Sequence, residues 1–374
     1  MRGPRPLAMT DVASRPRGGK VWASGAAVCL LLVVYAGIRI GIYVHRGMLG
    51  PNFPLIHAAY DFIFGEWPVW FAASGAGFAA FAVARPPARR SAGVVAAVLL
   101  FFCGDLLVLR HYVTHVEPER LVLRRVRLET TKLSEPLSIL HISDIQAGRI
   151  GPYQKRIFER IREIAPDLVL NTGDYLQVVP PTTFAEAFDD FMALVRSAEA
   201  RHGMFGVFGD TDYPLYRFDA EELAPLRLLS SRSADVETPG GVVSLHGLSL
   251  YQSKNPEWAL RGIRDWLDRS ADSEFRILLG HAPDFAKAVE TLPVDLCLAG
   301  HTHGGQVRLP LIGPLVIDSD VPKAWARGFR RVGVPHLNVS AGAGSNRYGG
   351  LPPLRFNCPT EMTLIELVPV RGIR

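Results

Sequence analysis

Residues 137–144 read "LSILHISD", a short apolar run that ends in the carboxylate of Asp144. This pattern predicts a buried β-strand, and apolar residues at helical spacing follow over Tyr153–Ile164, before Pro166. The same alternation of strand and helix recurs along the chain, and such alternation predicts an α/β layered fold. Further strands are expected in "DLVLNTG" (167–173), "MFGVFG" (204–209), "FRILLG" (275–280), "VDLCLAG" (294–300), "HLNVSAG" (336–342) and "MTLIELV" (362–368), and further helices over Phe184–Ala200 and Pro283–Leu292.

Each of the first five predicted strands runs into a residue that can bind a metal. The carboxyl ends of strands line the ligand crevice in open α/β sheets, so these side chains are expected at one edge. Oxygen and nitrogen ligands together suit Mn, Fe, Zn or similar ions. Six ligands exceed what one open catalytic metal needs, which favours two metals that share a carboxylate. The six residues are Asp144, Asp174, Asp210, His281, His301 and His303.

A structural explanation also exists for each piece. A Gly-Asp pair after a strand is commonly a turn or a helix cap, and a histidine there is commonly a hydrogen-bonded side chain. The stretch "GHTHGG" at 300–305 is harder to explain in this way, since glycines open and close a loop that presents two imidazoles. Five strand ends that all carry ligand types favour a metal site.

The segments "SDIQAG", "TGDY", "FGDTD", "LGHAPD" and "AGHTHGGQVRLP" resemble the calcineurin-like metallophosphoesterase family. That family is marked by D-x-H, G-D, G-N-H-D, a later H and G-H-x-H, each after a strand. The resemblance covers about residues 117–369. The ending "GLPPLRFNCPTEMTLIEL" is similar to a membrane-associated bacterial subgroup, some members of which cleave the pyrophosphate of UDP-diacylglucosamine. The resemblance implies a four-layer α-β-β-α sandwich.

The resemblance also implies two divalent metal ions and a hydroxide, held between them, that attacks phosphorus in line. The first metal would take Asp144, Asp174 and His303. The second would share Asp174 and take Asp210, His281 and His301. The implied activity is hydrolysis of a phosphodiester or pyrophosphate, with a phosphorylated lipid or nucleotide-linked substrate.

Three positions depart from the family pattern. Gln146 stands where D-x-H has histidine, and it offers a weaker carbonyl oxygen or does not bind metal at all. Asp210 stands where an asparagine would ligate, which lowers the net charge of the centre from about +2 to about +1 and holds anionic phosphate less strongly. At position 146 an oxygen ligand replaces the imidazole nitrogen of the family pattern, and this exchange favours Mn or Mg, with Fe or Zn as alternatives.

The third departure affects the candidate catalytic residues, Thr211 and Asp212. Thr211 replaces the family's histidine and cannot act as a general acid near neutral pH, while Asp212 could do so only with a raised pKa. A substrate with a good leaving group is therefore favoured. The alternative is a catalytically weakened member with a metal- or phospholigand-binding role. Arg149, Arg347 and Tyr348 could contact phosphate, or they are ordinary surface residues.

The first third of the chain predicts a membrane region. The runs Val21–Ile38, Pro68–Ala84 and Ser91–Leu109 approach the roughly 20 residues that span a bilayer. We expect a basic cytoplasmic segment at 1–20, about three transmembrane helices within 21–116 and the metallophosphoesterase domain at 117–374. A cleaved signal peptide followed by buried helices is the alternative.

The distribution of basic residues predicts the orientation in the membrane. Arginines and a lysine precede the first run, and Arg85, Arg89 and Arg90 precede the third, which places the N-terminus in the cytoplasm and the large domain on the outer, periplasmic side of the inner membrane. Leu55–Phe64 is expected to be an interfacial helix, and a crossing there would reverse this orientation.

Three further features of the sequence carry expectations. Arg39 and Asp105 either pair with each other or snorkel to the interface. The chain has 41 Lys and Arg against 36 Asp and Glu, but no basic block with interleaved aromatic residues, so nucleic acid is not an expected partner. Four cysteines do not predict a disulfide framework.

Overall fold

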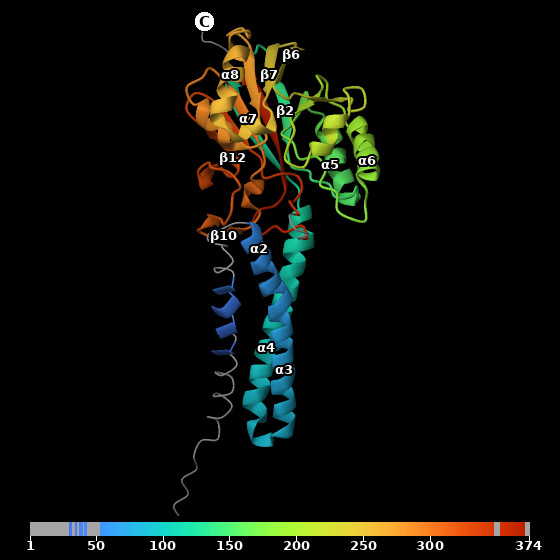
Figure 1. Ribbon diagram of the computed structural model, residues 1–374, viewed down its shortest axis with the longest axis vertical. Coiled ribbons are helices and arrows are strands. Elements are labelled where there is room, and N and C mark those ends of the chain that lie inside the picture. The colour runs from blue at the N-terminus through green and yellow to red at the C-terminus, as the bar shows by residue number, and fades with distance from the viewer. Residues whose placement is uncertain are drawn as a thin grey trace, which may run out of the picture. The chain divides into compact units, whose positions relative to one another are not determined.

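The computed structural model describes residues 30, 31, 34, 35, 37–39, 41, 42, 53–347 and 352–370 (Figure 1). The chain divides into two compact units, Met1–Arg110 and His111–Arg374. The larger unit holds the predicted strands, and the smaller unit holds most of the apolar runs.

Two six-stranded sheets form the larger unit, and a small hairpin joins β10 (Arg308–Leu309) to β11 (Gly313–Pro314). In the first sheet β2 to β5 are parallel, while β14 is antiparallel to β2. In the second sheet β7, β8, β9 and β13 are parallel, and the edge strands are antiparallel to their neighbours. The first sheet has the order β1 (Val122–Thr130), β14 (Glu361–Pro369), β2 (Leu137–Ile142), β3 (Leu168–Asn171), β4 (Met204–Gly206) and β5 (Leu226–Leu228). The second has the order β12 (Gly328–Arg331), β13 (His336–Val339), β9 (Leu296–Ala299), β8 (Phe275–Leu279), β7 (Gly241–Gly247) and β6 (Arg232–Thr238).

Alternating side chains along the strands bury both faces of each sheet. In β2, Ile139 packs in the core between the sheets, while Leu140 packs against helices α5 (Pro152–Ile164) and α6 (Phe184–Ser197). In β8, Ile277 faces the same central core, and Leu278 packs against α8 (Pro256–Leu267). Figure 1 shows α5 and α6 on one side of the strands and α7 (Leu250–Lys254) and α8 on the other. The expected α-β-β-α layering is therefore observed.

The helix predicted over Pro283–Leu292 is wrong in kind and length. The segment forms a short 3-10 helix, η6 (Pro283–Ala288). Asp284, in its first turn, accepts hydrogen bonds from the Ser319 hydroxyl and the Asp320 backbone N–H. These contacts tie the segment to a distant loop, which local spacing does not reveal.

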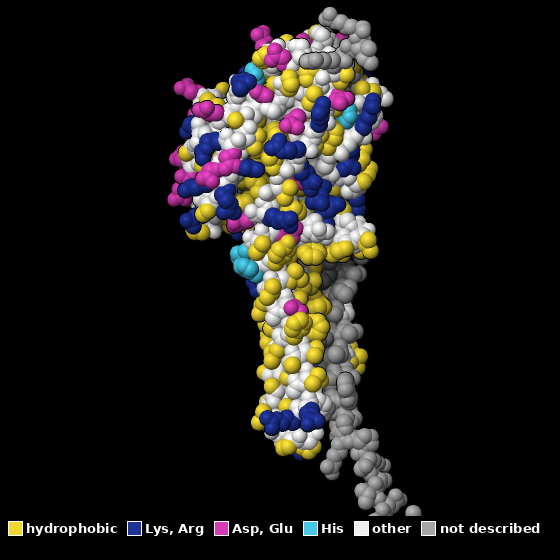
Figure 2. Space-filling model, turned by 180° about the vertical axis from the view of Figure 1, so that it is seen from behind, with side chains coloured by type: hydrophobic (Ala, Val, Ile, Leu, Met, Phe, Trp, Pro, Cys, Tyr) yellow, Lys and Arg dark blue, Asp and Glu magenta, His cyan; other side chains and the backbone are white. Residues whose placement is uncertain are grey.

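The smaller unit contains α2 (Phe53–Tyr60), a π-helical segment η1 (Asp61–Glu66), α3 (Trp67–Ala84) and α4 (Arg89–His111). Two helical stretches, Ala58–Ala84 and Pro86–Glu119, have the length and composition to cross a membrane. Apolar side chains lie over the surface of these helices in Figure 2, and Val83 is 82% exposed. Most of the predicted first span, Val21–Ile38, lies outside the described residues.

Two expectations about this unit are corrected. The stretch 55–64 is not a separate interfacial helix, because α2 continues through η1 into α3 without a break. Arg39 forms its ion pair with Glu66, at 2.9 Å, and not with the expected Asp105. The Tyr35 hydroxyl also donates to Glu66, so this carboxylate contacts one residue of the first apolar run and the arginine that directly follows the run. Cys103, Cys297 and Cys358 are free cysteines.

Candidate metal centre

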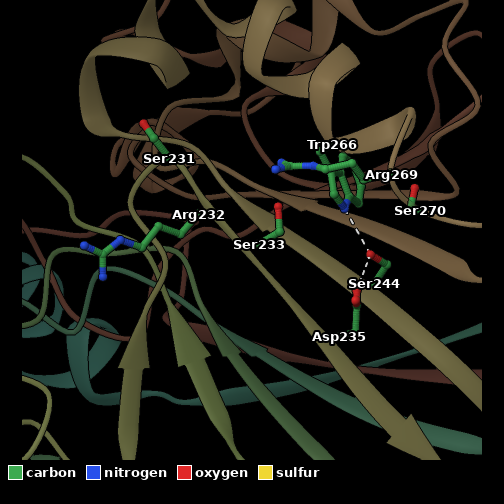
Figure 3. A pocket seen from close by; sticks show the side chains of 8 residues that line it. All are labelled: Ser231, Arg232, Ser233, Asp235, Ser244, Trp266, Arg269 and Ser270. Carbon is green, nitrogen blue, oxygen red and sulfur yellow. Dashed lines mark hydrogen bonds between the residues drawn. The ribbon is translucent and has the colours of Figure 1, made fainter.

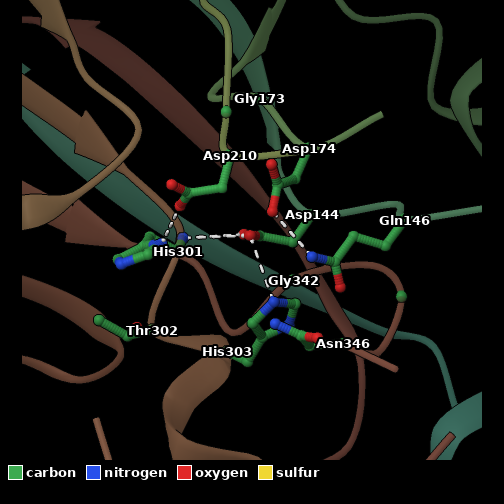
Figure 4. Close-up of polar contacts among 12 residues, drawn as sticks. Asp144, Gln146, Gly173, Asp174, Asp210, His301, Thr302, His303, Gly342 and Asn346 are labelled. Carbon is green, nitrogen blue, oxygen red and sulfur yellow. Dashed lines mark hydrogen bonds and ion pairs between the residues drawn. The ribbon is translucent and has the colours of Figure 1, made fainter. Parts of the chain in front are cut away.

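Five of the six strand-end residues that the sequence singles out converge in two groups that share His281. Asp144 follows β2, Asp174 follows β3, and His281 follows β8. These three offer ligand atoms that all lie within 4.8 Å of one another, and so do Asp210, His281 and His301. Figure 4 shows the three carboxylates and His301 turned toward a common point.

The group of Asp210, His281 and His301 matches the set expected for the second metal. His301 Nδ1 lies 2.9 Å from Asp210 Oδ2, and His281 Nε2 lies 3.4 Å from the same oxygen. His281 Nδ1 lies 2.7 Å from the Thr172 carbonyl oxygen, to which it donates. This bond orients the ring, and the buried Nε2 atom faces the carboxylates without a hydrogen-bond partner among the described residues.

The group of Asp144 and Asp174 needs a nitrogen ligand other than His281. One imidazole lone pair serves one metal, and the second nitrogen of His281 is committed to Thr172. His303 is the expected ligand here, and its Nε2 lies 3.5 Å from Asp144 Oδ1. Both residues are almost fully buried. His303 thus lies beside the group, although it falls outside the tightest cluster.

Gln146 occupies the position of the missing histidine. It is 3% exposed, and its side-chain nitrogen donates to Asp174 Oδ2 at 2.7 Å. Its Oε1 atom is buried and has no hydrogen-bond partner among the residues that the structure describes. Gln146 therefore orients Asp174 through its amide nitrogen and has one oxygen left for a further ligand.

Backbone conformation at these residues is unusual. The candidate ligands Asp144, Asp174, His301 and His303 and the neighbouring Gln146 all have positive φ, from 41° to 67°. For residues with a Cβ atom this region is sparsely populated and costs about 1–3 kcal/mol, so it persists only where the surrounding fold enforces it. Two glycines allow the close approach: a Cβ on Gly209 would overlap Asp174 Oδ1, and one on Gly300 would overlap Ser143 and Asp144.

A family model described as calcineurin-like phosphoesterase matches residues 137–305, which include all six candidate ligands. The phosphodiesterase YaeI of Escherichia coli (strain K12) is 31% identical over 271 residues, which cover 69% of this chain and 92% of that protein. The chain belongs to the calcineurin-like phosphoesterase family. The uncharacterized metallophosphoesterase YkuE of Bacillus subtilis (strain 168) is also 31% identical, over 217 residues, which cover 57% of this chain and 72% of that protein. Membership makes the chain a hydrolase that acts on phosphoesters.

The electrostatics of the protein alone fit the divalent ions that this family implies. Burial raises the pKa of Asp144 to about 6, against the opposing effect of His281. Burial would lower the pKa of His281, but the surrounding carboxylates, Asp174 first, raise it to about 10. Three carboxylates in a largely buried site therefore call for positive charge. Together with the buried Nε2 atom of His281, which faces the carboxylates, this donor set suits divalent cations.

Asp210 differs from the other two carboxylates because its side chain is 36% exposed. Burial would raise its pKa, but the close approach of His281 and His301 outweighs that effect and holds the pKa well below its usual range. Its second oxygen, Oδ1, lies 2.6 Å from Lys254 Nζ. Lys254 is not predictable from the sequence as part of the site, since a lysine 44 residues from Asp210 carries no local signal of this contact.

The two candidate catalytic residues, Thr211 and Asp212, have separate surroundings. The Thr211 backbone N–H donates to Asp174 Oδ1 at 2.8 Å, and its hydroxyl is buried without a partner. Asp212 accepts backbone N–H bonds from Gly209, Asp174 and Tyr175. Burial and the nearby Asp174 raise the pKa of Asp212 to about 7, yet both its oxygens are committed to holding these two loops together.

A buried arginine supports the His303 side of the centre. Arg355 is fully buried and donates to the carbonyl oxygens of Ala341, Gly344 and Cys358. The loop that it holds returns to the centre, because the Gly344 N–H donates to the Asp144 carbonyl oxygen at 2.7 Å. Arg355 lies in the C-terminal motif quoted above, but its contacts could not be inferred from that motif.

Several cavities lie outside the ligand groups. One of them, of about 560 Å³, is lined by Gly148, Arg149 and Arg347, together with prolines and two acidic residues; Tyr348 lies outside the described residues. Another, of about 480 Å³, lies between β6, β7 and α8 (Figure 3). In it the Trp266 N–H donates to the Ser244 hydroxyl, which donates to Asp235.

Proposed function

We propose that this chain is a membrane-anchored, metal-dependent phosphoesterase that hydrolyses a phosphodiester or pyrophosphate of a lipid or envelope intermediate. The observation that carries the proposal is the convergence of three carboxylates and three imidazoles at one edge of the sandwich, with the Nε2 atom of His281 buried and facing the carboxylates. Burial of three carboxylates at one site is energetically costly unless a cation neutralises their charge.

We assign the second metal to Asp210, His281 and His301 and the first to Asp144 and His303, with Asp174 shared. Divalent ions there, with Mn or Mg favoured over Fe and Zn, would supply Lewis acidity and an activated water. The chain's own part is orientation. Thr172 orients the ring of His281, Gln146 and the Thr211 N–H fix the carboxylate of Asp174, and Asp212 joins the loops.

The surroundings of Thr211 limit the substrate. A threonine hydroxyl donates a hydrogen bond but does not transfer its proton at neutral pH, so it cannot protonate a departing alkoxide. Asp212 has no free oxygen for that task, because three backbone amides occupy its carboxylate. An aryl ester or a phosphoanhydride leaves as a weak base and needs little protonation. The proposed substrate is therefore a diester or pyrophosphate with a good leaving group.

The membrane part of the proposal rests on composition and charge. The stretches Ala58–Ala84 and Pro86–Glu119 have the length of membrane spans, and Arg85, Arg89 and Arg90 lie between their apolar parts. With the run at 21–38 as a further span, the positive-inside rule puts the domain at 117–374 on the outer face of the inner membrane. A substrate embedded in or attached to that membrane would then be within reach.

Hydrolysis of bis-(4-nitrophenyl) phosphate by the full chain in detergent with added Mn tests the function. The His301→Ala/His303→Ala variant removes a nitrogen ligand from each group, and we expect at least about a 1,000-fold loss of activity together with loss of bound metal. The control is His202→Ala, since His202 precedes β4 and lies at the opposite edge. Full activity or full metal content in the double variant would refute the proposal.

A binding or regulatory role is the second candidate, and the departures at Gln146 and Thr211 favour it. A protein of that kind would bind Mn and inorganic phosphate with the same dependence on His301 and His303. It would release no aryl alcohol above the rate of the double variant. Binding and turnover measured on one preparation therefore separate the two functions.

A further inference from the structure

The carboxylate of Asp210 is shared between the candidate metal centre and a lysine. Its Oδ2 atom faces His301 and His281, at 2.9 and 3.4 Å, while Oδ1 lies 2.6 Å from Lys254 Nζ. Side-chain exposures of 37% for Lys254 and 36% for Asp210 place this ion pair at the open side of the centre. Substrate would reach the ligands from that side.

The fold positions Lys254 for this contact. It is the last residue of α7 (Leu250–Lys254), where the carbonyl end of a helix favours a cation. The preceding residue, Ser253, is fully buried, and its hydroxyl accepts a hydrogen bond from the Ala282 N–H at 3.2 Å. Ala282 directly follows the candidate ligand His281. The short helix that carries Lys254 is thus tied to the loop that carries a ligand of the same group.

The ion pair between Lys254 and Asp210 changes the net charge of the candidate metal centre. With Asp210 in place of the neutral asparagine of the family pattern, the ligand set gains one negative charge. The ammonium of Lys254 cancels that charge within hydrogen-bond distance of it. The ligands together with Lys254 then carry the same net charge as a set with asparagine and no lysine.

We propose that Asp210 and Lys254 act as a unit in which Lys254 restores the positive charge that the centre needs to hold an anionic phosphoryl group. Lys254 is a positioning and charge-compensating residue of the site, and this inference rests on the proposed function. An ordinary surface ion pair would contribute little to stability and nothing to ligand binding. The two explanations therefore differ in what happens to Mn and phosphate affinity when the lysine is removed.

A double-mutant cycle on the full chain in detergent tests the unit, with Asp210→Asn, Lys254→Met and the double variant. Mn affinity is measured by competition with a fluorescent chelator, and affinity for inorganic phosphate by calorimetry on the Mn-loaded protein. We expect Lys254→Met to bind Mn about tenfold more tightly and phosphate about tenfold more weakly, because an uncompensated carboxylate attracts cations and repels anions. Asp210→Asn should bind Mn about tenfold more weakly.

The double variant decides the inference. It has the native net charge, so the opposite effects of the two single variants should cancel, and both affinities should return to within about threefold of those of the native protein. Lys254→Arg retains the charge and should keep both affinities. The matched control is Lys132→Met, which breaks the 2.8 Å ion pair of Lys132 with Asp295, a residue that precedes β9 at the opposite edge.

Two results would overturn the inference. One is an unchanged affinity for both Mn and phosphate in Lys254→Met, and the other is a double variant whose affinities for Mn and phosphate stay at the values of Lys254→Met. Either result would leave the proposed function intact if the native protein binds Mn and hydrolyses the aryl diester. Failure of the native protein to bind Mn would instead remove the proposed function and this inference together.

Discussion

The two groups of candidate ligands are not equally well built. Asp210, His281 and His301 form the more complete group, with a hydrogen bond that orients His281 and a lysine that balances Asp210. The group of Asp144 and Asp174 is more deeply buried, but it has a glutamine where the family pattern has a histidine. The Gln146 amide nitrogen donates a hydrogen bond to Asp174, and its oxygen has no hydrogen-bond partner among the described residues.

The difference shows that two departures from one family pattern have different consequences. The aspartate at 210 is compensated by a residue from another element, which keeps the balance of charge. The glutamine at 146 has no such compensation among the described residues, because its Oε1 atom has no partner there. We therefore expect the Asp210 group to bind metal more tightly than the Asp144 group.

Removal of one histidine from each group gives the largest expected effect. His281→Ala should reduce kcat/KM for the aryl diester about 1,000-fold, because it takes the oriented nitrogen from the better-built group. His303→Ala should cost less, about 100-fold, since the affected group is already weaker. Metal content measured on both variants shows which ion is lost. A greater loss in His303→Ala would reverse the comparison between the groups.

Restoring the family residues should recover chemistry that the native site lacks. Gln146→His, Asp210→Asn and Thr211→His supply the missing ligand and proton donor, and Lys254→Met keeps the net charge unchanged. We expect about a 100-fold gain with an alkyl phosphodiester and little change with the aryl ester, because only the alkoxide needs a proton. The rate ratio of the two esters is the measurement, and a parallel rise in both would show that protonation is not limiting.

Local pattern was sufficient to predict the layered fold and the positions of the candidate ligands. The run 137–142 and its counterparts are buried strands because both faces of each sheet are covered, and such strands read as continuous apolar stretches. The prediction was weaker where distant residues decide the structure. Contacts of Asp284 with Ser319 and Asp320 hold the expected helix at 283–292 as a 3-10 turn.

The same limit applies within the site. The ligand types at the strand ends were visible in the sequence, because each directly follows an apolar run. Lys254 and Arg355 were not, since each reaches its partners through tertiary structure alone. Asp212 was considered as an acid on the basis of its place in the motif, and only the three backbone donors reveal its structural commitment.

A buried histidine beneath the better-built group gives a smaller, pH-dependent effect. The Asn338 amide donates to His141 Nδ1, so the neutral ring donates from Nε2 to Thr172, whose carbonyl oxygen orients His281. Burial lowers the pKa of His141 to about 3. Because the unfolded chain takes up a proton below about pH 6.5 and the folded chain does not, stability is complete above that pH and declines toward pH 3, by about 2 kcal/mol at pH 5.

His141→Gln keeps a polar side chain at this position without its titration. Urea unfolding of the full chain, followed by the fluorescence of buried Trp266, should then show a shallower fall in stability between pH 7 and pH 5 than in the native protein. The difference between the two slopes is the measured quantity, since carboxylates elsewhere contribute equally to both. Equal slopes would contradict the assignment of this pH dependence to His141.

The smallest expected effect comes from repairing the weaker group alone. Gln146→His supplies a nitrogen ligand beside Asp144 and removes the hydrogen bond from the Gln146 amide to Asp174. The affinity for the second equivalent of Mn should therefore rise about tenfold. Affinity for the first equivalent, held by the Asp210 group, should stay unchanged. Gln146→Ala is the control, because it removes the same bond without adding a ligand. If both variants shift Mn affinity equally, the hydrogen bond from Gln146 to Asp174 makes the Asp144 group the weaker one, and the missing histidine does not.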